Sequence, residues 1–167
     1  MRIAVLTVSD AGARGERADT SGDAVVAWGE GRSYLVAARA LVSDESSQIV
    51  AHLVHWCDAD AADLVLTTGG TGLSPRDITP EATRAVLERE APGLAERMRI
   101  VCIDSFPRAA LSRGVAGTRG RTLIINLPGS TSGVRDSLAA LEPVIDHAIA
   151  ILREDPTDHT RGALAGA

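Results

Sequence analysis

The chain has 167 residues, of which 45% are hydrophobic and 23% charged, and its formal net charge at pH 7 is −5. This length and composition predict one globular domain whose core needs no metal or disulfide. An acidic chain without a basic run excludes a nucleic-acid surface on electrostatic grounds. No apolar stretch approaches the roughly 20 residues that cross a bilayer, and the two cysteines form no CxxC pair, so we expect a cytoplasmic protein without a membrane segment.

Four short runs of aliphatic and β-branched residues predict β-strands. They span residues 2–9, 34–42, 63–69 and 122–128. Three of the runs are almost continuously apolar, which is typical of strands that are covered on both faces.

The stretches between these runs show helical spacing. Apolar side chains recur at helical intervals in 44–57, and polar residues at its start can serve as the N-cap. A further helix should lie in 79–90, where Thr79 can cap it and Pro80 suits the first helical position, and a short one should follow Pro92. Strands that alternate with helices predict an α/β fold with a mainly parallel sheet between helical layers.

The last helical pattern covers residues 132–153, and Pro143 should kink or divide that helix. We expect residues 1–153 to form the domain. Residues 154–167 carry no apolar stripe, so we expect them to be a disordered tail.

Two turns that contain glycine follow predicted strands. They are TTGGTG (67–72) and NLPGSTSG (126–133). Glycines there let the backbone approach a ligand closely and direct N–H groups toward an anion. The first turn matches neither the P-loop pattern GxxxxGK[ST] nor the dinucleotide pattern GxGxxG, and a tight strand-to-helix turn is the alternative interpretation. The second turn and nearby acidic residues favour an anion site.

Two acidic residues near strand ends are the first candidates for chemistry. Asp77 follows the first glycine turn, and a carboxylate beside a phosphate-binding loop makes sense when a divalent cation lies between the two anions. Asp44, at the end of the second predicted strand, could point toward the same crevice. Either residue could instead cap the helix that follows it.

Further polar and small residues lie at the ends of the first and fourth strands, where ligands bind in parallel sheets. They suit an oxygen-rich ligand, although helix caps and polar turns use the same residue types. They are Ser9, Asp10, Asp19, Ser21 and Gly22 on the first side, and Asn126, Pro128, Gly129 and Ser130 on the second.

Other reactive side chains give weaker signals. Arg113 could contact an anion, but a solvated arginine is the better interpretation. His52 and His55 lie three residues apart without a third ligand nearby, which disfavours a metal site. Cys57 and Cys102 have no neighbouring histidine, so we expect small buried side chains.

Four segments, in this order, resemble the molybdopterin adenylyltransferase family, which includes MogA, MoaB and the G domain of gephyrin. They are DTSGD (19–23), VSDES (42–46), TTGGTGLSPRDITPEAT (67–83) and LSRGVAGTRGRTLIINLPGS (111–130). The resemblance covers about residues 2–153, and the combination of both glycine turns makes it specific.

The resemblance implies a three-layer αβα sandwich that transfers AMP from ATP to the terminal phosphate of molybdopterin and releases pyrophosphate, with Mg²⁺ as the cofactor. Asp44 and Asp77 would then be the catalytic and metal-binding residues. Residues 126–130 would face the pterin. The nucleotide phosphates would be held by Gly69, Gly70, Thr71 and Gly72.

The resemblance also implies a homotrimer or a hexamer of trimers, and a molybdenum insertase is a possible partner. One departure is Thr131, which follows NLPGS where the family pattern has proline. Two other functions stay open: a molybdopterin-binding or scaffold module without transfer, and another nucleotide-pyrophosphate enzyme on the same fold, as in the competence-damage proteins.

Overall fold

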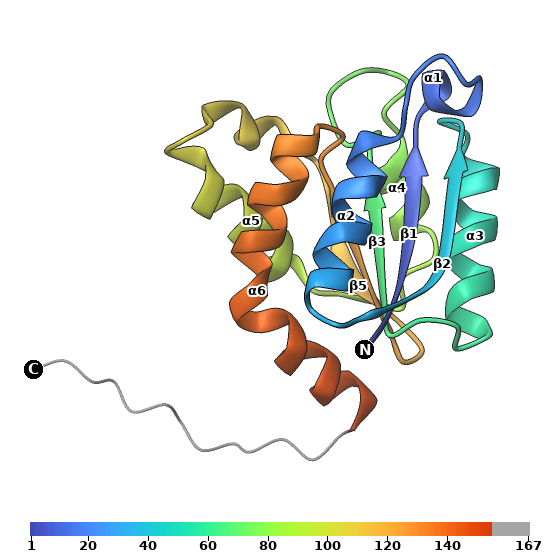
Figure 1. Cartoon of the computed structure of the whole chain (residues 1–167), viewed down its shortest axis with the longest axis vertical. Helices are drawn as coiled ribbons and strands as arrows, with labels where there is room; N and C mark the ends of the chain where they lie inside the picture. The colour runs from blue at the N-terminus through green and yellow to red at the C-terminus, as the bar shows by residue number, and fades with distance from the viewer. Residues whose placement is uncertain (155–167) are drawn as a thin grey trace, which may run out of the picture.

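The computed structural model describes residues 1–154, so the expected tail lies outside the described residues except for Glu154. A six-stranded sheet runs through the centre of the molecule, with helices on both faces (Figure 1). The strands are β1 (Arg2–Val8), β2 (Leu35–Val42), β3 (Leu64–Thr68), β4 (Arg89–Glu90), β5 (Ala116–Arg119) and β6 (Thr122–Leu127). The helices are α1 (Asp10–Ala13), α2 (Thr20–Gly31), α3 (Ser46–Asp58), α4 (Thr79–Arg84), α5 (Pro92–Ile103) and α6 (Thr131–Arg153), with a 3₁₀ turn, η1 (Pro107–Leu111).

The strand order is β2-β1-β3-β6-β5-β4. The pairs β1–β2, β1–β3 and β3–β6 are parallel, whereas β5 is antiparallel to both β6 and β4. This arrangement confirms the prediction of a mainly parallel α/β sheet. The chain passes from β1 to β2 on one side and then returns to β3 on the other, so the topological switch lies between β1 and β3.

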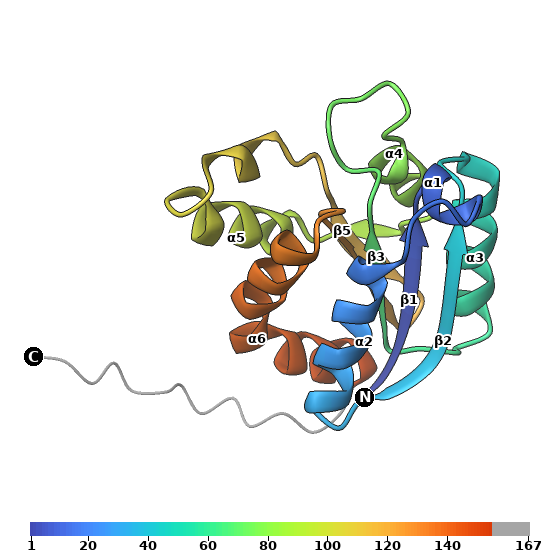
Figure 2. The ribbon, with the colours of Figure 1, turned by 45° about the horizontal axis from the view of Figure 1, so that its top comes forward.

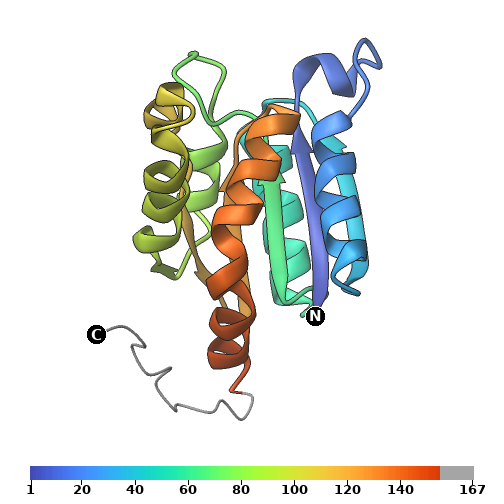
Figure 3. The same ribbon diagram turned by 60° about the vertical axis from the view of Figure 1, so that its left-hand side comes forward.

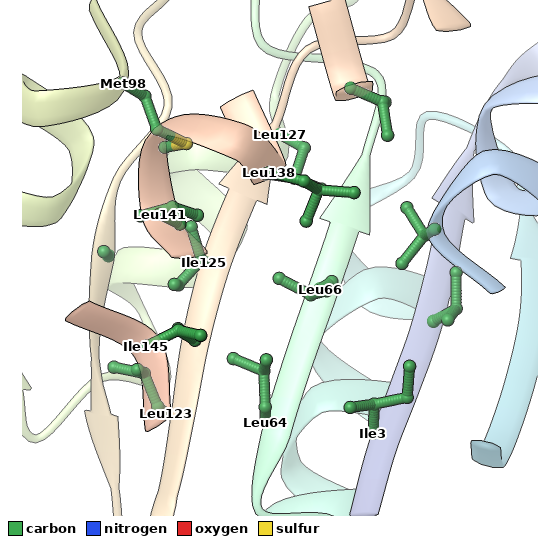
Figure 4. Packing of buried hydrophobic residues seen from close by; sticks show 14 of the residues in the cluster. Ile3, Leu64, Leu66, Met98, Leu123, Ile125, Leu127, Leu138, Leu141 and Ile145 are labelled. Atoms are coloured by element: carbon green, nitrogen blue, oxygen red, sulfur yellow. The ribbon is translucent and has the colours of Figure 1, made fainter. Parts of the chain in front are cut away.

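One face of the sheet packs against α2, α5 and α6, which lie side by side (Figure 3). Leu64 and Leu66 point to this face because side chains alternate along a strand, and they meet Leu138 of α6 in a continuous apolar layer (Figure 4). The other face holds Val65 and packs against α3 and α4. Burial on both faces explains why these strands read as unbroken apolar runs.

The helix predicted in 79–90 needs correction, because α4 ends at Arg84 and Arg89–Glu90 form β4. Pro143 does not divide α6, because buried side chains on both sides of it, such as Leu141 and Ile145, hold the helix on the sheet. The short strands β4 and β5 were not predicted. None of the helices in residues 1–154 is long and apolar enough to cross a membrane.

Candidate active site

The carboxyl ends of the parallel strands meet at one edge of the sheet, which comes forward in Figure 2. A cavity of about 220 Å³ opens there, and we call it the first cavity. Its lining comes from the ends of all four parallel strands: Ser9 follows β1, Asp44 follows β2, Gly69 follows β3 and Gly129 follows β6. The two predicted glycine turns therefore meet at the switch point of the sheet.

The glycine turn after β3 adopts a backbone that favours glycine, because Gly69 and Gly70 have φ angles of 97° and 62°. A Cβ on Gly69 would overlap the carbonyl oxygen of Val8. A Cβ on Gly129 would lie 3.2 Å from the Cα of Gly69. The two turns thus pack directly against each other and against β1, with no room for side chains.

Both candidate carboxylates flank this turn. A Cβ on Gly70 would lie 2.9 Å from Oδ1 of Asp44, and a Cβ on Gly72 would lie 2.7 Å from Oδ2 of Asp77. Asp77 does not cap α4, because its Oδ2 accepts a hydrogen bond from the backbone N–H of Ser74 at 3.0 Å. Bare backbone allows both acidic groups to lie close to the turn, and both line the first cavity.

The carboxylate of Asp44 is held by a reciprocal pair of hydrogen bonds. The N–H of Asp10 donates to Oδ2 of Asp44 at 2.9 Å, and the N–H of Asp44 donates to Oδ1 of Asp10 at 3.0 Å. Arg76 donates to both carboxylate oxygens of Asp10 and to Glu45. Asp44 is therefore oriented by the end of β1, and it does not serve as the N-cap of α3, a position that Glu45 occupies.

The pKa values of these carboxyl groups shift in opposite directions. Burial raises the pKa of Asp44, and the negative charges of Asp10 and Asp77 add to that rise. The hydrogen bonds from Arg76 lower the pKa of Asp10. A buried carboxylate with two acidic neighbours produces a negative potential that a cation would neutralise.

A second cavity, of about 320 Å³, lies beside the first. The two cavities share Gly70, Asp77 and Gly129. Pro128 and Ser130 line the second cavity from the β6 turn, and the loop after α5 contributes lining residues as well. The site consequently has two lobes, with the glycine turns and Asp77 at their junction.

The sequence and fold agree with a known family. Residues 4–147 match the family described as the probable molybdopterin binding domain. This chain belongs to that family. The finding confirms the resemblance seen in the sequence.

Known members of the molybdopterin-binding family cover most of the chain. The structure of the molybdopterin biosynthesis enzyme MoaB from Thermus thermophilus shares 55% sequence identity and a TM-score of 0.88, covering 94% of this chain and 99% of that one. The molybdopterin adenylyltransferase of Helicobacter pylori strain J99 is 40% identical over 154 residues, which cover 91% of this chain and 88% of that protein. The molybdenum cofactor synthesis protein cinnamon of Drosophila melanogaster is 40% identical over 152 residues, but this chain spans only 25% of that longer protein.

Asp44 and Asp77, which both line the first cavity, have the chemistry of magnesium ligands. Within residues 1–154, no three His, Cys, Asp or Glu side chains form a metal-binding group. Mg²⁺ in nucleotide enzymes is commonly held by one or two carboxylates, with phosphate oxygens and water completing its shell. Asp44 and Asp77 supply such a pair of carboxylates. The buried hydroxyl of Thr79 lies beside Gly70 and has no hydrogen-bond partner among the described residues. This hydroxyl is therefore a polar group next to the glycine turn that the protein itself does not satisfy.

Most of the predicted site residues line one of the two cavities. Thr71 and Gly72 line the second cavity, as Pro128 and Ser130 do. On the β1 side, the first cavity is lined by Ser9, Asp19 and Ser21. Asp10, Gly22 and Asn126 line neither cavity.

Asp19 and Gly22 have a capping role at the start of α2, which was the alternative interpretation of this loop. The carboxylate of Asp19 accepts from the N–H of Gly22 at 2.8 Å, from the hydroxyl of Thr7 and from the guanidinium of Arg39. A Cβ on Gly22 would overlap the carboxylate of Asp19, so glycine is required for the cap. Ser130 similarly caps α6 by accepting from the N–H of Gly133 at 3.1 Å.

Asn126 has partners other than the expected substrate. Its side chain is 1% exposed. The amide nitrogen donates to the hydroxyls of Thr67 and Thr83, each at 2.9 Å, and the amide oxygen accepts from the N–H of Val115 at 3.2 Å. Both N–H groups of the amide and its oxygen thus join neighbouring segments, and this bonding favours a structural role for Asn126 over contact with substrate.

The expectation of a freely solvated Arg113 is wrong, because its guanidinium bonds to protein acceptors although its side chain is 33% exposed. Its Nε donates to the carbonyl of Gly72 at 2.7 Å, and its other nitrogens contact the carbonyl of Asp77 and the carboxylate of Glu81. Reasoning from single motifs also missed several lining residues, among them Arg17 in the first cavity and Phe106 and Arg108 in the second. Only the position of Arg17 in a polar loop after β1 offered a signal.

The cysteines are buried, as expected. Burial raises the pKa of Cys57 to about 11. His52 packs against the ring of Trp56, with ring centroids 5.2 Å apart. These residues take no part in the site.

Proposed function

We propose that this chain is a molybdopterin adenylyltransferase that uses Mg²⁺ and transfers AMP from ATP to the terminal phosphate of molybdopterin. The observation that carries the proposal is the pair of carboxylates, Asp44 and Asp77, that lie close to a glycine turn at the junction of two cavities. A two-substrate phosphate transfer needs such a junction, since the reacting groups must meet there. The name of the Helicobacter pylori relative supports the same reaction.

The charge of the site fits two polyanionic substrates. The sequence contains 17 lysine and arginine residues in total, and every one of them is arginine. Near the glycine turn, Arg76 is bonded to Asp10 and Glu45, and Arg113 is bonded to carbonyls and Glu81. The phosphates would therefore be met by the backbone N–H groups of residues 69–72 and by a bound cation, with Arg17 and Arg108 as the arginines that line the two cavities.

In the proposed reaction, an oxygen of the terminal phosphate of molybdopterin attacks the α-phosphorus of ATP. The bond from that phosphorus to the bridging oxygen of the β-phosphate breaks, and pyrophosphate leaves with the bonding electrons. Such transfers depend on positioning and charge stabilisation more than on a protein nucleophile. Mg²⁺ held by Asp44 and Asp77 would supply neutralisation of the phosphate charge.

The two cavities suggest where each of the two substrates binds. The nucleotide phosphates would lie along residues 69–72, and the pterin would lie in the second cavity beside Pro128 and Ser130. Phe106 is 43% exposed in that cavity, and a flat heterocycle could stack on its ring. Thr131 bonds to Thr20 between the starts of α6 and α2, which holds the β6 turn in place without the proline of the family pattern.

The expected assembly and cellular setting belong to the same proposal. α5 exposes the apolar side chains of Ile100, Val101 and Ile103, a pattern typical of subunit contacts, which supports a homotrimer or a hexamer. Light scattering coupled to gel filtration would test this, and a monomer at micromolar concentration would contradict it. We further propose a cytoplasmic location and a molybdenum insertase that accepts the adenylylated product.

The transfer itself is tested by incubating purified protein with ATP, Mg²⁺ and molybdopterin while following pyrophosphate and adenylylated pterin. The proposal predicts that both products form only when pterin is present. Binding of ATP without either product would instead support a molybdopterin-binding or scaffold module. Pyrophosphate release without pterin would indicate another nucleotide-pyrophosphate enzyme.

A further inference from the structure

The segment that carries Asp77 has little regular structure of its own. Residues 73–78 link the glycine turn to α4, and residues 73–76 are exposed. Within the segment, the N–H of Asp77 donates to the carbonyl of Ser74 at 2.9 Å, and the N–H of Ser74 donates back to the carboxylate of Asp77 at 3.0 Å. These bonds fix Asp77 relative to Ser74, but they do not fix either residue relative to the sheet.

Arg113 supplies that connection from a distant part of the chain. Its backbone N–H donates to the carbonyl of Thr71 at 2.9 Å, and its Nε donates to the carbonyl of Gly72 at 2.7 Å. A terminal nitrogen of the same guanidinium donates to the carbonyl of Asp77. One residue thus bonds to the main chain of the glycine turn and to the main-chain carbonyl of Asp77.

Arg113 is itself anchored to the sheet and to α5. Two residues further on, the backbone of Val115 exchanges hydrogen bonds with Asn126 of β6: the N–H of Val115 donates to the side chain and the N–H of Asn126 donates to the carbonyl of Val115. Arg99 of α5 donates to the carbonyls of Ser112 and Gly114, on either side of Arg113. The position of Arg113 is therefore set by regular structure.

The third side of the guanidinium bonds to Glu81 of α4, which balances its charge. A planar guanidinium can reach three acceptors in fixed directions, whereas the ammonium of lysine is a point charge that cannot reproduce this fork. Arg76 is a weaker anchor for the same segment, since its side chain is 56% exposed, against 33% for Arg113, and exposed ion pairs contribute little.

We propose that Arg113 is a positioning residue that fixes the distance between Asp77 and the glycine turn. Its catalytic consequence rests on the proposed AMP transfer. Because a Cβ on Gly72 would lie only 2.7 Å from Oδ2 of Asp77, the carboxylate has a defined place against the turn, and releasing the segment would displace it. Arg113 acts through Asp77 and is not expected to touch either substrate.

Arg113→Lys tests the inference, with Arg119→Lys as the matched control. Arg119 also bonds to one carboxylate, that of Asp58, and to one main-chain carbonyl, that of Val86, and its side chain is 25% exposed. It lies outside both cavities. Amide hydrogen exchange of residues 72–78, measured by mass spectrometry, reports placement of the segment, and steady-state kinetics against Mg²⁺ concentration report its consequence.

In Arg113→Lys we expect faster amide exchange at residues 72–78 than in wild type and a higher Mg²⁺ requirement. We also expect kcat to fall by about 10- to 100-fold, because misplacement by about 1 Å can reduce rates by two orders of magnitude. Arg119→Lys should leave all three unchanged. Glu81→Gln, which keeps both carbonyl bonds, should retain most of kcat. If Arg113→Lys does not fold, Arg113→Gln, which can still donate to one carbonyl, takes its place.

The inference is overturned if Arg113→Lys and Arg119→Lys show the same exchange at residues 72–78 and the same kcat. A fall in kcat that merely parallels lost thermal stability in both variants would also overturn it. If wild-type protein transfers no AMP, the proposed function fails, while the exchange comparison still decides whether Arg113 positions the segment.

Discussion

Replacing Gly70 with alanine adds one carbon atom, the Cβ, at the junction of the two cavities. Gly70 has a φ of 62°, and an added Cβ would lie 2.9 Å from Oδ1 of Asp44 and would overlap the hydroxyl of Thr79. A carbon–oxygen contact needs about 3.3 Å, so Asp44 must move by about 0.4 Å and Thr79 by more. Gly120→Ala is the matched control, because Gly120 has a φ of 54° and nothing within 4 Å of an added Cβ.

The two variants separate backbone strain from displacement of the carboxylate. Strain at positive φ costs about 1 kcal/mol in both, and overpacking adds about 1–3 kcal/mol in Gly70→Ala alone. At about 3 °C per kcal/mol for a chain of this size, we expect Tm to fall by about 3 °C in Gly120→Ala and about 6–12 °C in Gly70→Ala.

The rate of AMP transfer should separate the variants further. We expect it to fall by about a hundredfold in Gly70→Ala, because Asp44 is displaced, and to stay at the wild-type level in Gly120→Ala. Circular dichroism melts and the transfer assay measure both quantities. Equal Tm values and equal rates for the two variants would refute the claim that Gly70 places Asp44.

Three further predictions concern single side chains. Asp77→Asn should abolish most AMP transfer while changing Tm by less than Gly70→Ala does, since it removes a charge and keeps the shape; undiminished turnover would count against Asp77 as a metal ligand. Because the pKa of Asp44 is raised in the folded protein, the stability that this one group contributes is present below pH 3.8 and is lost as pH rises through its folded pKa. Asp44→Asn removes this contribution and should therefore raise Tm relative to wild type more at pH 7 than below pH 3.8, and a Tm difference that does not change with pH would contradict this. Cys57, whose pKa is about 11, should resist iodoacetamide at pH 8 until the protein is unfolded, and rapid labelling of native protein would show that the thiol is accessible.

The strands that form the centre of the sheet could be predicted from the sequence because burial on both faces makes them continuously apolar. β4 could not be predicted in the same way, since it consists of two exposed residues, Arg89 and Glu90. β5 contains Gly117, where an added Cβ would overlap the carbonyl of Arg89. That glycine allows a close approach between two backbones, a requirement that appears only when both strands are in place.

The glycine turns could be predicted because their function depends on local backbone. The cap formed by Asp19 was also a local alternative, with its acceptor three residues from Gly22. Asn126 and Arg113 could not be assigned, because a polar side chain after a strand looks the same whether it faces a pocket or the interior. The partners of Arg113 are main-chain carbonyls 36 and 41 residues away. Every residue has such a carbonyl, so the sequence cannot show which ones Arg113 contacts.

The central claim is that the α-phosphate of ATP passes to molybdopterin at the junction of Asp44 and Asp77. Its most direct test supplies wild-type protein with ATP labelled at the α-phosphate, together with Mg²⁺ and molybdopterin, and separates nucleotide from pterin products. We predict that the label appears in the pterin fraction in amounts equal to the pyrophosphate released, and that Asp77→Asn transfers little of it. Label that stays in AMP or ADP while the pterin remains unlabelled would contradict the account.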